Sequence, residues 1–171
     1  MPASYREKIM IFIDGSNLYW SCRRHPKNPI FKVDVLKLID KISKDRFLVR
    51  PYYYTAIGVP PSNGQVKFHH KLNYCGVTVV SRPLRRRGDG WTEKGVDVAL
   101  VTDLLAMAYR NVYDTAIIVS GDKDFEGAID EVKRLGKRVE VACFEHVISE
   151  DLKMRADKFI SLDDFYEEIK L

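Results

Sequence analysis

Acidic side chains follow two apolar segments, where they could hold a divalent cation. Asp14 follows segment 8–13, and Asp122 and Asp124 follow segment 115–120. Both segments are almost continuously apolar, which is typical of strands buried on both faces of a parallel sheet. In such a sheet, functional groups gather at the carboxyl ends of the strands, beside the point where the strand order reverses. With a strand order of 3-2-1-4-5, the first and fourth strands are neighbours and these acids face each other.

A third acid heads a long segment that we expect to be helical from about residue 95 to 111. Four of its residues share one face at about 100° per residue, and that face is the apolar one: Asp97, Val101, Leu104 and Ala108. We therefore expect Asp97 to head the stripe that packs on the sheet. Asp103 lies about 120° away from that stripe by the same period, so we expect it to face solvent.

Several carboxylates in one place repel one another unless a cation lies between them. Two unit charges 4 Å apart repel by about 4 kcal/mol at an effective dielectric near 20. An all-oxygen set of ligands without Cys or His favours Mg²⁺ or Mn²⁺ over zinc. Such an ion keeps several waters, one of which can attack a phosphoryl group. The alternatives are local: Asp14 as an Asx-turn former, and Asp97 and Asp122 as helix N-caps.

The remaining elements alternate along the chain. We expect further strands at 47–58, 76–83 and 137–144, with helices around 35–42, 65–75 and 123–136 and short helices at 149–157 and 161–170. Asp34, Ser149 and Ser161 are the expected N-caps. Alternating strands and helices predict an α/β fold, with a mainly parallel sheet covered by helices on both faces.

Composition agrees with one ordinary globular domain over residues 1–171. The net charge is +4 and the pI is about 8.9, which permits a polyanionic partner. The apolar runs are far shorter than the roughly 20 residues of a membrane-spanning helix, and we expect no secretory signal and no membrane contact. Three widely spaced cysteines are expected to be free thiols in a reducing cytoplasm: Cys22, Cys75 and Cys143.

A basic loop leads into the Asp97 helix. It carries the most concentrated positive charge of the chain: Arg82, Arg85, Arg86, Arg87 and Lys94. The loop could clamp a phosphate backbone, or it could be an ordinary solvated loop. Trp91 could stack on a base or pin the loop to the core. Ser16, after the first strand, is interpreted as a turn residue, and Tyr53 as a strand-packing residue.

Three motifs in this order resemble the NYN domain family, in its LabA-like branch within the PIN-like nucleases: "FIDGSNLY", "EKGVDVALVTDL" and "VSGDKDF". The similarity runs from about Ile9 to Phe165. It implies a PIN-like, Rossmannoid three-layer α/β/α sandwich with five strands in the order 3-2-1-4-5. It also implies a ribonuclease that depends on Mg²⁺ or Mn²⁺ and hydrolyses single-stranded or structured RNA.

The resemblance assigns roles to individual residues. Asp14, Asp97 and Asp122 match metal ligands, and Asp124 matches a fourth acid that binds the metal directly or through water. Asn17 and Ser120 match polar positions that orient ligands or phosphate. PIN-like nucleases often pair, so the resemblance also allows a homodimer.

Other functions are weaker or excluded. A non-catalytic RNA-binding or adaptor module with the same fold is the main alternative. A small-molecule phosphatase of the haloacid-dehalogenase type requires a second acid two residues after Asp14, where Ser16 stands. No G-x-G-x-x-G follows the first strand, and the chain has no G-x-S-x-G, which disfavours a dinucleotide-binding enzyme and a serine hydrolase.

Overall fold

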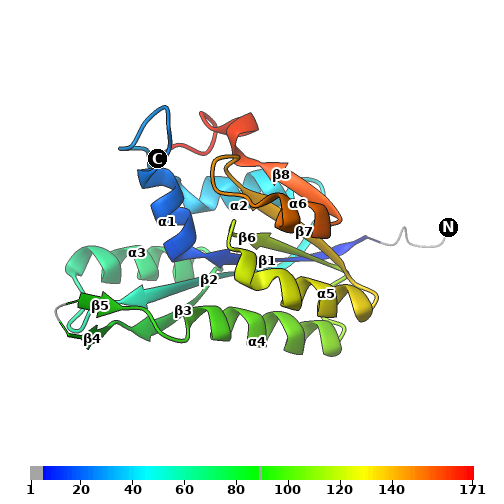
Figure 1. The fold of residues 1–171 in the computed structure, drawn as a ribbon, viewed down its shortest axis with the longest axis horizontal. Helices are drawn as coiled ribbons and strands as arrows, with labels where there is room; N and C mark the ends of the chain where they lie inside the picture. Colours follow the sequence, from blue (N-terminus) through cyan, green and yellow to red (C-terminus); the bar gives the residue numbers. More distant parts are fainter. Residues whose placement is uncertain (1–5, 89) are drawn as a thin grey trace.

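A six-stranded parallel sheet forms the middle layer of the molecule (Figure 1). The structure, a computed structural model, describes residues 6–88 and 90–171 except for the side chains of Arg87, Trp91 and Thr92. The strand order is β3-β2-β1-β6-β7-β8. These strands are Thr78–Pro83, Phe47–Ile57, Lys8–Asp14, Thr115–Val119, Arg138–Cys143 and Lys158–Ser161.

The strand order reverses between β1 and β6, which pair in parallel from Ile9–Thr115 to Ile13–Val119. The predicted α/β class and the predicted order of the first five strands are therefore confirmed. The sixth strand, β8, is not among the predicted elements. It forms because Phe159 and Ile160, which lie between two expected helices, pair alongside Val141 and Ala142 of β7.

Helices cover both faces of the sheet. The helices α1 (Gly15–Arg23), α2 (Val35–Ser43) and α3 (Asn63–Tyr74) pack on one face. The helices α4 (Val96–Tyr109), α5 (Glu126–Arg134) and α6 (Glu150–Arg155) pack on the other. Strand β1 feeds both cores, because Ile9, Ile11 and Ile13 face the first set of helices and Met10 and Phe12 face the second. Its continuous apolar character follows from this double burial.

The orientation of α4 differs from the prediction. Its buried stripe runs through Val96, Leu100, Leu104 and Ala108. Position 97 is therefore turned by about 100° from the stripe, and Asp97 is an exposed residue rather than its head. Asp103 does not simply face solvent: it is half-buried, and the hydroxyl of buried Tyr54 donates to its carboxylate at 3.0 Å. The predicted buried face of α4 was therefore displaced by one residue, since it begins at Val96 and not at Asp97.

Two further segments differ from the sequence analysis. The basic segment is not an irregular loop: Arg85–Arg87 (β4) and Gly90–Thr92 (β5) form an antiparallel hairpin. Figure 1 shows this hairpin beyond the ends of β2 and β3. At the C-terminus, the expected helix shrinks to a 3₁₀ turn at Leu162–Phe165, and no side-chain bond from Ser161 caps it. Asp34 and Ser149 do cap α2 and α6.

Candidate acidic site at the switch point

Asp14 lies at the carboxyl end of β1 and is only 4% exposed. Its Oδ1 accepts a hydrogen bond from the backbone amide of Asn17 at 3.0 Å, and its Oδ2 accepts one from the Ser120 hydroxyl at 3.2 Å. Burial, together with the charges of Asp97 and Asp122, raises the pKa of Asp14 to about 6, although the two hydrogen bonds act to lower it. The carboxyl is held in place but is electrostatically destabilised when ionised.

One side-chain hydrogen bond ties the loop after β6 to α1, and a second lies within the loop. The Gly121 amide donates to Oδ1 of Asn17 at 3.1 Å, and the Asp122 amide donates to Oγ of Ser120 at 3.1 Å. Asp122 caps the following 3₁₀ helix (Lys123–Phe125), since its Oδ1 accepts from the Asp124 amide at 3.0 Å. The capping alternative for Asp122 is therefore present in the structure, and it leaves the other carboxylate oxygen available.

Asp97 comes to the same place from α4. Gly95, with a φ of +82°, precedes the helix as its N-cap, so Asp97 is not the cap. Although Asp97 is exposed, partial desolvation by the neighbouring protein raises the pKa of its carboxyl, and so do the negative charges of Asp122, Glu93 and Asp124. The structure thus brings the predicted acids within electrostatic reach of one another, from β1, the β6–α5 loop and α4.

Glu93 is an acid that the sequence analysis missed. The Ser16 hydroxyl donates to its two carboxylate oxygens at 2.6 Å, so Ser16 is more than a turn residue. The charge of Glu93 also acts on Asp97 and Tyr53. The sequence did offer a signal for Glu93, because this acid stands two residues before Gly95, where the helix that carries Asp97 begins.

These groups differ from a preformed cage for a cation. Among residues 6–88 and 90–171, no set of three His, Cys, Asp or Glu side chains stands close enough to hold a metal ion. The donors are nevertheless all oxygens, and the repulsion on buried Asp14 is of the kind that a cation relieves. The residues fit a hydrated Mg²⁺ or Mn²⁺, which keeps several waters and needs few direct carboxylates.

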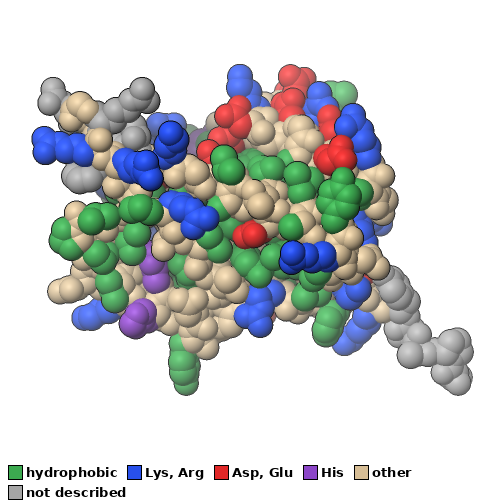
Figure 2. All heavy atoms as spheres, turned by 90° about the horizontal axis from the view of Figure 1, so that it is seen from below, with side chains coloured by type: hydrophobic (Ala, Val, Ile, Leu, Met, Phe, Trp, Pro, Cys, Tyr) green, Lys and Arg blue, Asp and Glu red, His purple; other side chains and the backbone are tan. Residues whose placement is uncertain are grey.

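The predicted basic residues lie toward the same end of the molecule. Arg82, Arg85, Arg86 and Lys94 are exposed, on the end of β3, on β4 and after β5. Figure 2 shows Lys and Arg side chains gathered at its upper left, the end where the hairpin lies. The side chains of Arg87 and Trp91 lie outside the described part of the chain.

The fold and these acids at its switch point define a PIN-like α/β protein. Residues 8–163 match the model of the NYN domain, and the chain belongs to the NYN domain family. It is 27% identical over 165 residues to the low amplitude and bright protein LabA of Synechococcus elongatus, covering 92% of this chain and 84% of LabA.

A solved structure has the same fold along the whole chain. The crystal structure of a Vibrio parahaemolyticus protein of unknown function is 30% identical, with a TM-score of 0.81 and coverage of 100% of both chains. In the part of the chain that the structure describes, no helix is long and apolar enough to cross a bilayer.

Proposed function

We propose that the chain is a metal-dependent ribonuclease that hydrolyses RNA phosphodiester bonds at the acidic site. The observation that carries this proposal is the environment of Asp14. It is a buried carboxyl at the switch point of the sheet, with a pKa raised by burial and by Asp97 and Asp122. Membership of the NYN domain family supports the same reaction class. The homodimer and the cytoplasmic location stay predictions.

In this proposal Asp14, Asp97 and Asp122 hold Mg²⁺ or Mn²⁺, and Asp124 acts directly or through a water. The ion, when bound, supplies charge stabilisation and a water with a lowered pKa. The backbone amide of Asn17 and the hydroxyl of Ser120 fix the orientation of the Asp14 carboxyl through their bonds to its two oxygens. The side chain of Asn17 accepts from the Gly121 amide and so holds the loop that carries Ser120 and Asp122. Helix α1 begins at Gly15, and Asp14 is its N-cap, because the Asp14 carboxylate accepts from the Asn17 backbone amide. The positive end of the helix therefore lies at the acidic site, where it favours a negatively charged group.

Asp122→Asn tests the site. We expect the variant to lose metal-dependent cleavage of a labelled structured RNA, because it removes one charge that holds the ion. The assay compares Mn²⁺, Mg²⁺ and EDTA, with single-stranded DNA as a second substrate. Asp40→Asn, an exposed acid on α2, is the matched control and should cleave like the wild type. If Asp122→Asn cuts as fast as the wild type, the acids do not form the active site.

The adaptor alternative has its own observation in favour, the wide spacing of the described acids. If this alternative holds, the protein should bind RNA with an affinity that falls as the salt concentration rises, and it should not cleave RNA with either Mg²⁺ or Mn²⁺ present. Persistent binding without cleavage by the wild type would make this alternative the better account.

The exposed cations of the hairpin region are proposed to bind the RNA backbone. Replacing both Arg86 and Lys94 by Ala should weaken RNA binding and lower the slope of log K against log salt by about 0.7 for each phosphate that the variant no longer neutralises. Arg110→Ala, at the opposite end of α4, is the control and should leave the slope unchanged. Equal slopes in the double variant and the wild type would contradict this role.

A further inference from the structure

A cavity of about 360 Å³ lies beside the acidic site, between α1 and the face formed by β2 and α3. Four of its lining residues contribute aromatic rings: Tyr19, Phe31, Tyr53 and Phe68. Arg23 and Lys32 add positive charge at its rim, and both are exposed. A site of this size with aromatic walls suits a flat aromatic group, and the cations suit an attached anion.

The cavity and the acidic site share a wall. Gly15 lines the cavity directly after Asp14, and the ring of Tyr53 lies against its backbone. A Cβ on Gly15 would stand only 2.5 Å from Cζ of Tyr53. A group in the cavity therefore lies against Gly15, one residue along the chain from Asp14.

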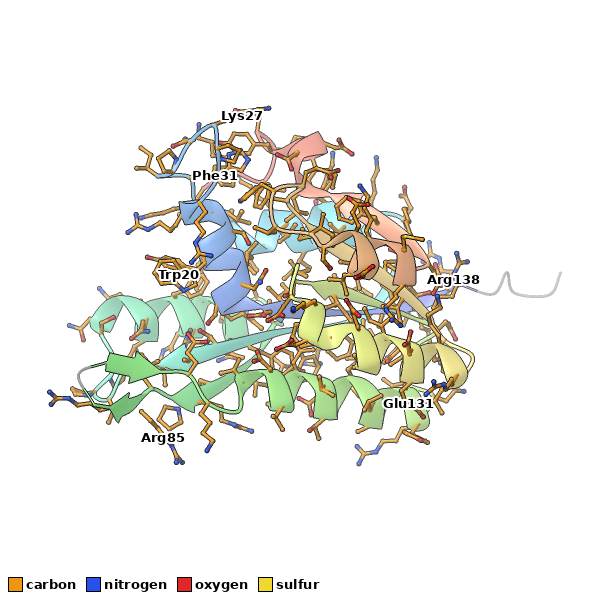
Figure 3. The ribbon with its side chains drawn as sticks, viewed as in Figure 1. Trp20, Lys27, Phe31, Arg85, Glu131 and Arg138 are labelled. Atoms are coloured by element: carbon orange, nitrogen blue, oxygen red, sulfur yellow. The ribbon has the colours of Figure 1, made fainter. Side chains whose placement is uncertain are left out.

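The outer surface of α1, beside the cavity, also carries aromatic rings and positive charges. Tyr19 and Trp20 are about half exposed, and their rings meet edge to face at 5.2 Å. The Arg23 guanidinium lies over the Tyr19 ring at 5.7 Å, and that of Arg24 lies over the Trp20 ring at 5.8 Å. Figure 3 shows Trp20 beside α1, on the side of the molecule where α3 lies.

The cations of this region lack acidic partners. Within residues 6–88 and 90–171, no ion pair joins Arg23, Arg24 or Lys32 to a carboxylate. Exposed aromatic rings interleaved with unneutralised cations match a single nucleic-acid strand, whose bases stack and whose phosphates need counter-charges.

We propose that the cavity takes one unstacked base of a single-stranded RNA, next to the phosphate at the acidic site, and that Tyr19, Trp20 and the α1 arginines carry the strand onward. This inference rests on the proposed function and narrows its substrate to single strands. A base can enter the cavity only if it has left its pairing partner, so a continuous duplex does not fit.

The test measures binding in EDTA, which separates it from cleavage. Fluorescence anisotropy follows a labelled eight-nucleotide RNA, the same strand annealed to its complement, and the strand with one abasic position. Tyr19→Ala and Phe68→Ala should each weaken binding of the single strand by about 10-fold, because each removes a stacking surface. Tyr74→Ala is the control: it lies on α3 like Phe68, is 93% exposed and does not line the cavity. Thermal melting verifies that each variant is folded.

The possible outcomes test the base-binding cavity and the ribonuclease activity as two separate proposals. If folded Tyr19→Ala and Phe68→Ala bind like Tyr74→Ala, or the duplex binds as tightly as the single strand, the cavity proposal is overturned while cleavage can stand. If the wild type binds single strands through these residues but cuts no RNA in any metal, the base site stands and the ribonuclease proposal fails. A wild type that binds neither the oligonucleotide nor uridine monophosphate overturns the cavity outright.

Discussion

Asp14→Asn is expected to lower the rate of RNA cleavage by about 100-fold or more while making the metal-free protein more stable at pH 7. The first effect follows from the proposed function, because the carboxylate is the buried centre of the acidic site. The second follows from the electrostatics alone. Burial and the charges of Asp97 and Asp122 disfavour the ionised form of Asp14 in the folded protein.

The direction of the pH dependence follows from the raised pKa. The folded protein holds the Asp14 proton up to a pKa of about 6, whereas the ordinary value is 3.8. Between these values the folded state binds more protons than the unfolded state, so the free energy of unfolding falls as the pH rises. The difference corresponds to about 3 kcal/mol, of which Asp14→Asn should recover about 1–3 kcal/mol at pH 7.

Urea unfolding in EDTA at pH 4, 5, 6 and 7 measures this effect. The stability advantage of Asp14→Asn should grow between pH 4 and 6 and then level off. Asp40→Asn should show no such growth, since Asp40 is exposed on α2. A stability difference between Asp14→Asn and the wild type that stays constant from pH 4 to pH 7 would contradict a raised pKa of Asp14 in the folded protein.

Gly121→Ala is expected to destabilise the protein by about 1–3 kcal/mol. A Cβ at this position would lie 2.7 Å from the carbonyl oxygen of Val147, a backbone atom that a rotamer change cannot move. Because the Gly121 amide also donates to Asn17, relief of the clash would pull the β6–α5 loop away from α1. Asp122 and Ser120 lie in that loop, so cleavage should fall together with stability.

Gly127→Ala provides the matched control for this substitution. Gly127 is exposed within α5, and a Cβ there meets no atom within 4 Å. Since Ala favours a helix over Gly by about 1 kcal/mol, this variant should be slightly more stable than the wild type. Thermal melting of both variants measures the contrast, and equal melting temperatures would contradict the close packing of Gly121 on Val147.

The parallel sheet could be predicted because its strands are buried on both faces. Segments 8–13 and 115–120 are almost continuously apolar, and the observed strands Lys8–Asp14 and Thr115–Val119 differ from them by one residue. A buried strand that ends at an acid indicates where Asp14 must lie. The convergence of Asp14 and Asp122 could therefore be expected from the carboxyl-edge rule. The place of Asp97 depended instead on the start of a helix, and the stripe from which it was inferred is out of phase by one residue.

Features set by tertiary contacts were harder to predict. Helix α4 is apolar on several sides, so its period did not reveal whether position 96 or 97 heads the buried stripe, and the burial of Asp97 and Asp103 was misjudged. Strand β8 has only four residues, too few to show a period. The bond from Ser16 to Glu93 joins residues 77 positions apart, so the sequence could mark Glu93 as an acid near Asp97 but could not show its contact with Ser16.

The bond between Ser120 and Asp14 can form only late in the synthesis of the chain. These residues are 106 positions apart, and β1 receives its neighbour β6 only after the chain has been extended past residue 119. A nascent chain leaves the ribosome from its N-terminus, so a chain made only as far as β6 carries Asp14 and Asp97 without Ser120 or Asp122. With the proposed activity, cleavage of RNA is therefore expected only from chains that have been extended past Asp122 and Asp124.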